Sequence, residues 1–311
     1  MKSLGRIILK FLLFLFISLN FIVAFHAYKF THFYEPGDVS KMDPAKASTW
    51  QKTQAILFGF NAVKQKNSTP DTVVQIITLA TSDNLKLEAW YIPVINSKGT
   101  VALFHGHGSK KSAILAEAHV FRSLGYNTML TDFRAHGGSE GSTCTIGYEE
   151  ARDVKAAYDF LAARQEKNII LYGISLGAAT ITKAIYDYGI TPSHIILDMP
   201  FASLPDAVRG RVKMMKLPQE PISTLLTLWG GLENGFWAFN MKPYQYARDV
   251  KCPVLLQRGS LDSRVTAEET NEIYANILAP KKLVTYANSG HESLCKKEPV
   301  KWQQEVALFL P

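Results

Sequence analysis

The chain has 311 residues, of which 47% are hydrophobic and 20% are charged, and it contains three cysteines. These values exclude an intrinsically disordered chain, a collagen-like repeat and a small disulfide-stabilised scaffold. The formal net charge of +7 would permit a nucleic-acid partner. However, three positive charges lie within residues 1–27 and the other basic residues are scattered, so no nucleic-acid partner is expected.

Residues 1–30 have the pattern of a membrane-directed segment. Lys2, Arg6 and Lys10 precede an uncharged run over 11–25 that is rich in Phe, Leu and Ile. Cationic flanks stay on the cytoplasmic side while an apolar helix enters the bilayer. We therefore expect a signal-anchor, that is, a single transmembrane segment in the cell membrane with a cytoplasmic N-terminus and the rest of the chain outside the cytoplasm. The alternative is a cleaved signal and a secreted or periplasmic protein, because the run is short for a span.

The rest of the chain divides into a stalk and a domain. Residues 31–70 are polar and end in a loop signal, so we expect a stalk there and a domain over 71–311. The first elements of the domain lie over 73–79 and 85–92, with a turn signal at 82–84 between them, and the second alternates in polarity, which predicts an antiparallel hairpin.

Six short apolar runs follow, and they alternate with segments of helical length. Continuous apolar runs suit parallel strands that are buried on both faces, and the alternation favours an α/β fold with helices on both sides of the sheet. The runs cover residues 101–104, 128–130, 169–172, 195–197, 254–256 and 283–286. The interval 203–246 has no strand pattern and predicts a helical insertion over the carboxyl edge of the sheet.

The motif G-x-S-x-G occurs twice, around Ser175 and around Ser139. Ser175 directly follows a predicted strand and directly precedes the apolar helix over 176–188, which is the context of a nucleophile elbow. Ser139 lies in a loop at which no helix begins. We therefore expect Ser175 to be the nucleophile.

A serine nucleophile needs a base, and the base needs an acid that orients it. His291 follows the last predicted strand, and Asp262 follows the strand before it. All three side chains therefore lie at the carboxyl ends of parallel strands, where ligand crevices form. We expect Ser175, Asp262 and His291 to form a catalytic triad.

The other polar residues at strand ends receive different interpretations. Asp198 and Asp132 also end predicted strands and are the rivals of Asp262 for the role of the acid. The segment 198–200 is instead expected to shape the wall of the crevice, and Asp132 is expected to pair with Arg134. His105 and His107 are only two residues apart, but no carboxylate or cysteine nearby completes a zinc site, so no metal is expected. His105 is expected to have a packing role.

Acyl transfer also needs hydrogen-bond donors for the oxyanion that develops on the substrate. The loop over 104–109 follows a predicted strand, where a first donor is expected. We expect the backbone N–H groups of His107 and Leu176 to form the oxyanion hole.

With these residues the chain, from about 73 to 310, resembles the α/β-hydrolase superfamily. Residues 132–139, Asp-Phe-Arg-Ala-His-Gly-Gly-Ser, look like the family's Asp-x-Arg-Gly-His-Gly-x-Ser loop, with Ala135 in place of a glycine. The strongest similarity is to the serine-aminopeptidase-like and monoglyceride-lipase-like branch. The resemblance implies a mostly parallel eight-stranded sheet, a cap inserted after the sixth strand, no cofactor, and hydrolysis through an acyl-enzyme at Ser175, Asp262 and His291.

The cap suggests the substrate, because its Met, Trp and Phe side chains are typical of an apolar pocket. We expect a carboxylesterase or lipase that acts on a small-molecule or lipid-like acyl ester. A serine aminopeptidase is the alternative, in which Glu220 or Glu233 would hold the substrate amine. A non-catalytic, membrane-tethered binding protein is the third interpretation.

Overall fold

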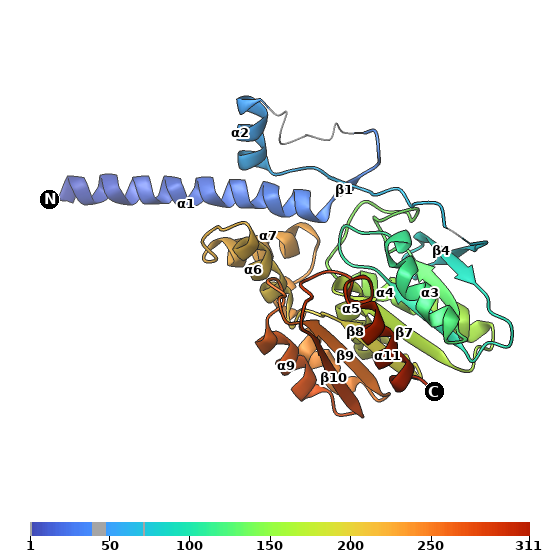
Figure 1. Ribbon diagram of the computed structural model, residues 1–311. Helices are drawn as coiled ribbons and strands as arrows, with labels where there is room; N and C mark the ends of the chain where they lie inside the picture. Colours follow the sequence, from blue (N-terminus) through green and yellow to red (C-terminus); the bar gives the residue numbers. More distant parts are fainter. Residues whose placement is uncertain (1, 39–47, 71) are drawn as a thin grey trace.

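An eight-stranded sheet forms the centre of the computed structural model, which describes residues 2–38, 48–70 and 72–311 (Figure 1). The strands are β3 (Gln75–Ala80), β4 (Lys86–Ile92), β5 (Thr100–Phe104), β6 (Asn127–Thr131), β7 (Ile169–Ile174), β8 (His194–Asp198), β9 (Val254–Gly259) and β10 (Lys281–Tyr286). They lie in the order β10-β9-β8-β7-β5-β6-β4-β3, and β4 runs antiparallel to both of its neighbours while the other pairs are parallel. The predicted hairpin is the β3–β4 pair, and the mostly parallel sheet is confirmed.

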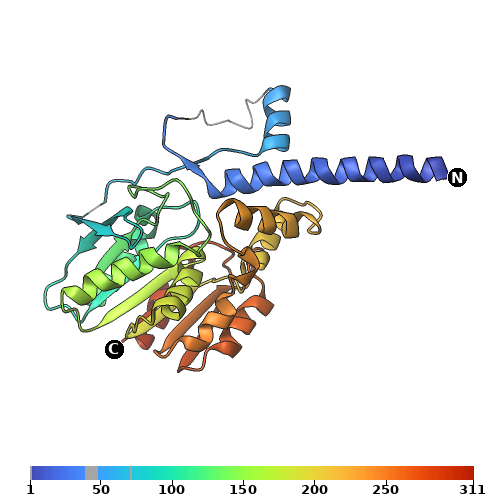
Figure 2. The same cartoon turned by 180° about the vertical axis from the view of Figure 1, so that it is seen from behind.

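Helices cover both faces of the sheet (Figure 1 and Figure 2). One face is covered by α3 (Leu115–Ser123) and α11 (Pro299–Phe309). The other face is covered by α4 (Glu150–Ala163), α5 (Leu176–Tyr188) and α9 (Ala267–Asn276). This is the arrangement that strand–helix alternation predicts for a parallel sheet.

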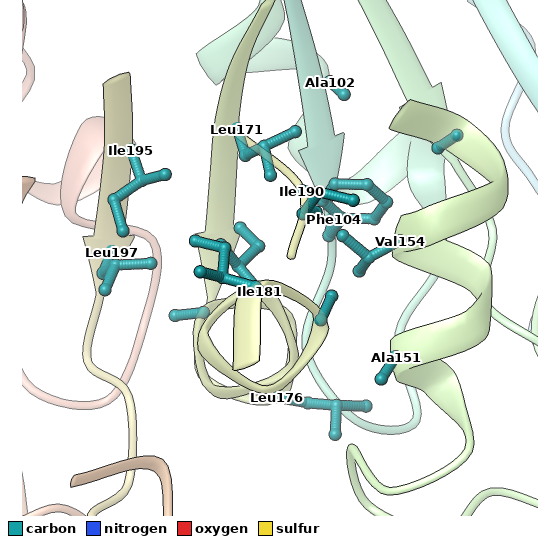
Figure 3. Close-up of a cluster of buried hydrophobic side chains, with 14 of the residues drawn as sticks. Ala102, Phe104, Ala151, Val154, Leu171, Leu176, Ile181, Ile190, Ile195 and Leu197 are labelled. Atoms are coloured by element: carbon teal, nitrogen blue, oxygen red, sulfur yellow. The ribbon is translucent and has the colours of Figure 1, made fainter. Parts of the chain in front are cut away.

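The core between α4, α5 and the sheet is apolar and closely packed. Figure 3 shows side chains of α4 and α5, among them Val154 and Ile181, beside Phe104 of β5 and Leu171 of β7. All four of these side chains are completely buried. Burying apolar surface stabilises the fold by about 25 cal/mol per Å². This layer therefore holds α5, and the residue that precedes it, against β5 and β7.

The interval between β8 and β9 is helical, as predicted. It contains α6 (Leu204–Met214) and α7 (Ile222–Glu233), followed by short helical turns that include α8 (Pro243–Tyr246). The Ser203 hydroxyl caps α6 by accepting a hydrogen bond from the Asp206 N–H. Because β8 is the sixth strand of the sheet along the chain, the predicted cap after the sixth strand is confirmed.

The first helix, α1 (Lys2–Thr31), extends well beyond the domain (Figure 1). Thirty residues make a helix about 45 Å long. Its large apolar side chains between residues 4 and 17 are 46% to 67% exposed, whereas Val23 and Ala27 are buried where α1 contacts α7. A second helix, α2 (Thr49–Phe58), also contacts α1. The outer half of α1 thus presents apolar surface on all sides, while its last turns belong to the folded domain.

The predicted stalk contains additional structure. A short strand directly after α1, β1 (Phe33–Tyr34), pairs in parallel with β2 (Ala62–Val63). Lys64 is buried, and its Nζ donates to the backbone oxygen of Ser139 at 3.0 Å. The chain around β2 therefore contacts the domain, while the domain boundaries drawn from the sequence stay predictions.

Two buried ion pairs replace the expected contact between Asp132 and Arg134. Asp132 pairs with the ammonium of Lys111, which also reaches Glu88 at 2.6 Å. Arg134 donates to the Asp153 carboxylate from Nε at 3.0 Å and from Nη2 at 2.7 Å. The expected pair is wrong because partners distant in the sequence reach these two side chains.

Removing the Asp153 carboxylate should destabilise the domain. Asp153→Ala leaves part of the charge of the buried Arg134 side chain without its partner, and breaking a buried pair costs about 3–5 kcal/mol. Asp159→Ala on the same helix is the matched control, because Asp159 forms an exposed i,i+4 pair with Lys155 that contributes about 0.3–0.5 kcal/mol. Urea unfolding of the full chain in detergent measures both changes. Equal effects of the two substitutions would contradict this assignment.

Candidate active site

Ser175 lies in the sharp turn between β7 and α5. Its φ of 53° lies in the positive region, which residues other than glycine rarely adopt. A Cβ at Gly177 would lie 2.4 Å from the carbonyl oxygen of Phe104, and a Cβ at Gly173 would lie 2.4 Å from the Gly177 backbone. Both positions therefore need glycine. The Ser175 N–H donates to the Asp198 carbonyl oxygen at 2.7 Å, which helps to hold this strained turn at the carboxyl edge of the sheet.

The structure brings together the three residues that the sequence predicts as a triad. His291 Nε2 lies 2.9 Å from Ser175 Oγ, and His291 Nδ1 lies 2.7 Å from an Asp262 carboxylate oxygen. The imidazole therefore bridges the hydroxyl and the carboxylate, although 116 residues separate Ser175 from His291 in the sequence. A neutral imidazole that donates to Asp262 from Nδ1 presents the lone pair of Nε2 to the serine hydroxyl.

The surroundings of Asp262 keep its carboxylate ionised and fixed. One oxygen faces His291, and the other accepts hydrogen bonds from the backbone N–H groups of Arg264 at 2.8 Å and Val265 at 2.9 Å. Burial raises the pKa of Asp262, but the hydrogen bond and charge of His291, together with these two N–H groups, outweigh it and hold the pKa below its usual value. The carboxylate can therefore orient the imidazole at neutral pH.

Asp198 does not shape the crevice wall as expected, because its side chain points into the core. It is fully buried and accepts hydrogen bonds from Tyr172 at 2.8 Å, Gln257 at 2.8 Å and Trp302 at 3.2 Å. Burial raises the pKa of Asp198 to about 7. Its contribution to the site is the carbonyl oxygen that holds the Ser175 turn.

Ser139, the serine of the second G-x-S-x-G motif, is buried and takes part in hydrogen bonds that stabilise the fold. Its hydroxyl donates to the Asp132 carbonyl oxygen at 2.7 Å, and it accepts from the Glu88 N–H at 2.9 Å. The first interaction closes the loop after β6 on itself, and the second ties this loop to β4. His105 is also buried, and it accepts a hydrogen bond from the Phe133 N–H at 3.2 Å, so its role is one of packing.

His107 and Leu176 both border the space next to Ser175. Leu176 is the first residue of α5, so its N–H has no partner within the helix. Neither backbone N–H donates a hydrogen bond within the parts of the chain that the structure describes. Two free donors beside a nucleophile can stabilise an oxyanion.

The side chain of His107 joins this loop to the first helix. Its ring stacks on the ring of Phe30 of α1, with the centroids 4.4 Å apart. Burial, and then the positive charge of Arg211, hold the pKa of His107 well below its usual value. The ring is therefore neutral, and the last turn of α1 packs on a residue that borders the space beside Ser175.

The space beside Ser175 is small and carries positive charge. Its volume is about 30 Å³, which is close to that of one water molecule in the liquid. Two arginines from different elements border it, one on α6 and one after β9, and sequence reasoning missed both because no motif contains them. The polar residues around this space are Ser175, His291, His107, Arg211 and Arg264.

No metal-binding cluster accompanies the site. Within residues 2–38, 48–70 and 72–311, no group of three or more His, Cys, Asp or Glu side chains could hold a metal ion. The arrangement can perform proton transfer between an imidazole and a hydroxyl, followed by attack of the hydroxyl on an electrophile.

Comparisons with known proteins agree with this topology. The family model described as serine aminopeptidase, S33, matches residues 95–232, which include Ser175. The uncharacterised protein YqkD of Bacillus subtilis is 24% identical over 228 residues, which are 72% of this chain and 75% of that protein. The lysophosphatidylserine lipase ABHD12 of Danio rerio is 26% identical over 216 residues, which are 65% of this chain and 52% of that protein.

Solved structures include similar folds. The structure of the Pyrococcus furiosus esterase Pf2001 matches with a TM-score of 0.66 and 25% identity, and covers 81% of this chain and 98% of its own. An esterase from Exiguobacterium antarcticum shares the fold, with a TM-score of 0.59 and 16% identity. The match covers 76% of this chain and 99% of the esterase. The family model and these structures, together with the mostly parallel sheet flanked by helices, support placing the chain in the α/β-hydrolase superfamily.

Proposed function

We propose that this protein is a membrane-anchored serine hydrolase that cleaves acyl esters through an acyl-enzyme. The observation that carries the proposal is the imidazole of His291, which lies within hydrogen-bond distance of both Ser175 Oγ and the Asp262 carboxylate. The similarity to esterases and to a lipase supports an esterase- or lipase-like hydrolase, and the ester specificity is our inference.

The geometry supports a two-step reaction. His291 Nε2 takes the proton of Ser175 as the hydroxyl oxygen attacks the ester carbonyl, while the N–H groups of His107 and Leu176 stabilise the oxyanion. The tetrahedral intermediate then expels the alcohol, which takes its proton from His291. Water attacks the acyl-enzyme in the same way, the acid leaves, and Ser175 regains its proton. Asp262 holds the imidazole in the required tautomer throughout.

Ser175→Ala should abolish ester hydrolysis. We expect kcat for a nitrophenyl ester to fall by about 10⁶-fold, because the nucleophile is lost while the fold is kept. Labelling of the full chain by a fluorophosphonate, detected by mass spectrometry of the labelled peptide, should disappear as well. A label that moves to Ser139, or remains elsewhere, would contradict the assignment. Wild-type protein that neither turns over acyl substrates nor reacts at Ser175 would favour the non-catalytic binding protein.

The aminopeptidase alternative has less support from the site. An amine-binding site needs a carboxylate, but Glu220 interacts with its helical neighbours Ser223 and Thr224 and does not border the space beside Ser175. Glu233 lies elsewhere, at a separate surface pocket. Two arginines border the site instead, and like charges placed together cost several kcal/mol.

Ester substrates should therefore be preferred over aminoacyl substrates. We expect the wild-type protein to hydrolyse nitrophenyl esters with a kcat/KM at least about 100-fold above that for an aminoacyl anilide, since the arginines repel the ammonium group. A panel of esters of increasing chain length, measured beside the anilide, checks this. A higher kcat/KM for the anilide would contradict the ester proposal and favour the peptidase.

The membrane anchor is inferred from the surface of α1. Leu4–Thr31 is long and apolar enough to cross a membrane, and an 18-residue stretch within it has a mean hydropathy of 2.6. Exposed apolar patches of this size mark membrane or protein interaction sites. The buried side chains near the end of α1 support retention rather than cleavage, because loss of residues 1–27 would remove part of the domain's packing.

The retained anchor makes a prediction about localisation. The mature protein should stay in the membrane pellet after carbonate extraction and should migrate with the full chain rather than with a Δ1–27 variant. The measurement is an immunoblot of fractionated cells, with both chains as size markers. A soluble mature protein that migrates with Δ1–27 would show a cleaved signal instead.

A further inference from the structure

A second and larger cavity lies between α1 and the cap. Its volume is about 250 Å³, compared with the ~150 Å³ of an engineered apolar cavity that holds benzene. Ala27 and Phe30 of α1, Val208 and Val212 of α6, and Leu226 of α7 contribute to its wall. The wall is mostly apolar, and the first helix supplies one side of it. A cavity with this lining suits a hydrocarbon chain.

This cavity meets the space beside Ser175 at two arginines. Arg211 and Arg264, together with Ile146, border both spaces. Phe30 lies at the same junction, because the guanidinium of Arg211 lies 4.6 Å from the centre of its ring. A molecule that extends from Ser175 into the larger cavity therefore passes both guanidinium groups.

The backbone brings these arginines together. A Cβ at Gly210 would lie 2.2 Å from the Arg264 carbonyl oxygen, so α6 contacts the loop after β9 without an intervening side chain. Arg211 follows Gly210 directly and is consequently held next to Arg264. Burial, and then the charge of Arg264, lower the pKa of Arg211 to about 10. Arg211 still carries its charge at neutral pH.

No carboxylate of the described chain neutralises this pair. Neither guanidinium forms an ion pair within residues 2–38, 48–70 and 72–311, and Arg264 Nε faces the sulfur of Met214 at 2.9 Å. By contrast, Arg209 on the same helix pairs with Asp206 at 2.5 Å. Two unpaired like charges in a partly buried site cost stability, and arginine favours carboxylate and phosphate ligands through its planar donors.

We propose that Arg211 and Arg264 bind the negatively charged head group of a single-chain acyl lipid, whose hydrocarbon chain occupies the cavity between α1 and the cap. The proposal rests on the proposed function, since it names the substrate class of the same site. It gives the first helix a second role, as a wall of the substrate site. The cap residues Met214 and Met215 border this cavity and are 45% and 59% exposed, so its rim is apolar and suited to contact with a bilayer.

Binding can be tested without catalysis. The full chain carrying Ser175→Ala, in nanodiscs of phosphatidylcholine, is titrated calorimetrically with oleoyl lysophosphatidic acid, with neutral oleoylglycerol and with inorganic phosphate. We expect lysophosphatidic acid to bind about tenfold or more tightly than oleoylglycerol, which corresponds to at least one charge-assisted hydrogen bond. Inorganic phosphate should bind more weakly still, because it lacks the chain.

Substitution of the arginines separates this proposal from a structural role. Arg211→Gln, added to Ser175→Ala, should reduce the preference for lysophosphatidic acid to about twofold, whereas the matched control Arg209→Gln should keep it. Because Arg211 has no acidic partner, Arg211→Gln should not lower the melting temperature. The proposal would be overturned if lysophosphatidic acid bound no more tightly than oleoylglycerol or than inorganic phosphate. It would also be overturned if Arg211→Gln and Arg209→Gln had equal effects. Turnover of nitrophenyl esters by the protein with Ser175 intact reports on the proposed function separately.

Discussion

The close contact of α5 with β5 and β7 is the constraint on which the site depends. Because Gly177 lies against the Phe104 carbonyl and Gly173 against the Gly177 backbone, the helix begins directly at the end of the strand. Ser175 is then forced into a positive φ, and its hydroxyl reaches the edge where the other strands also end. The buried layer of α4 and α5 side chains stabilises this contact and so offsets the strain of the turn.

The same edge gathers the other groups. β9 ends before Asp262, β10 before His291 and β5 before His107, so residues separated by up to 184 positions lie around one small space. The cap begins after β8 and brings Arg211 over this edge. The last turns of α1 complete the enclosure, because Phe30 contacts both His107 and Arg211. The end of α1, the cap and the candidate site therefore contact one another, so a change in the last turns of α1 should alter the loop that carries His107.

Local patterns in the sequence predicted most of the fold. The predicted helix over 176–188 has those bounds in the structure, and the predicted strands agree to within a few residues, because buried apolar runs and amphipathic periods are local signals. Ser175 and His291 could be singled out because motif and strand-end position coincide. Asp262 and Asp198 both lie between Ser175 and His291 in the sequence, so chain order alone does not separate them, and only the fold shows that the Asp198 carboxylate points into the core.

Contacts between distant segments could not be predicted in this way. The ion-pair partners of Asp132 and Arg134 come from other elements, and no pattern in the neighbouring sequence indicates Lys111 or Asp153 as the partner. The short distance between Arg211 and Arg264 depends on the close approach of the backbone at Gly210, which is a property of tertiary packing. Likewise, the hydrophobicity of α1 predicts a membrane segment, but it does not indicate that Phe30 contacts His107 and Arg211, which border the space beside Ser175.

The most direct test of the account is a crystal or cryo-electron microscopy structure of the full chain after reaction with a long-chain fluorophosphonate. We expect phosphorus bonded to Ser175 Oγ, a phosphoryl oxygen within about 2.7–3.1 Å of the backbone nitrogens of His107 and Leu176, and the alkyl chain between α1 and the cap. An adduct on another residue, or a phosphoryl oxygen turned away from both nitrogens, would contradict the account.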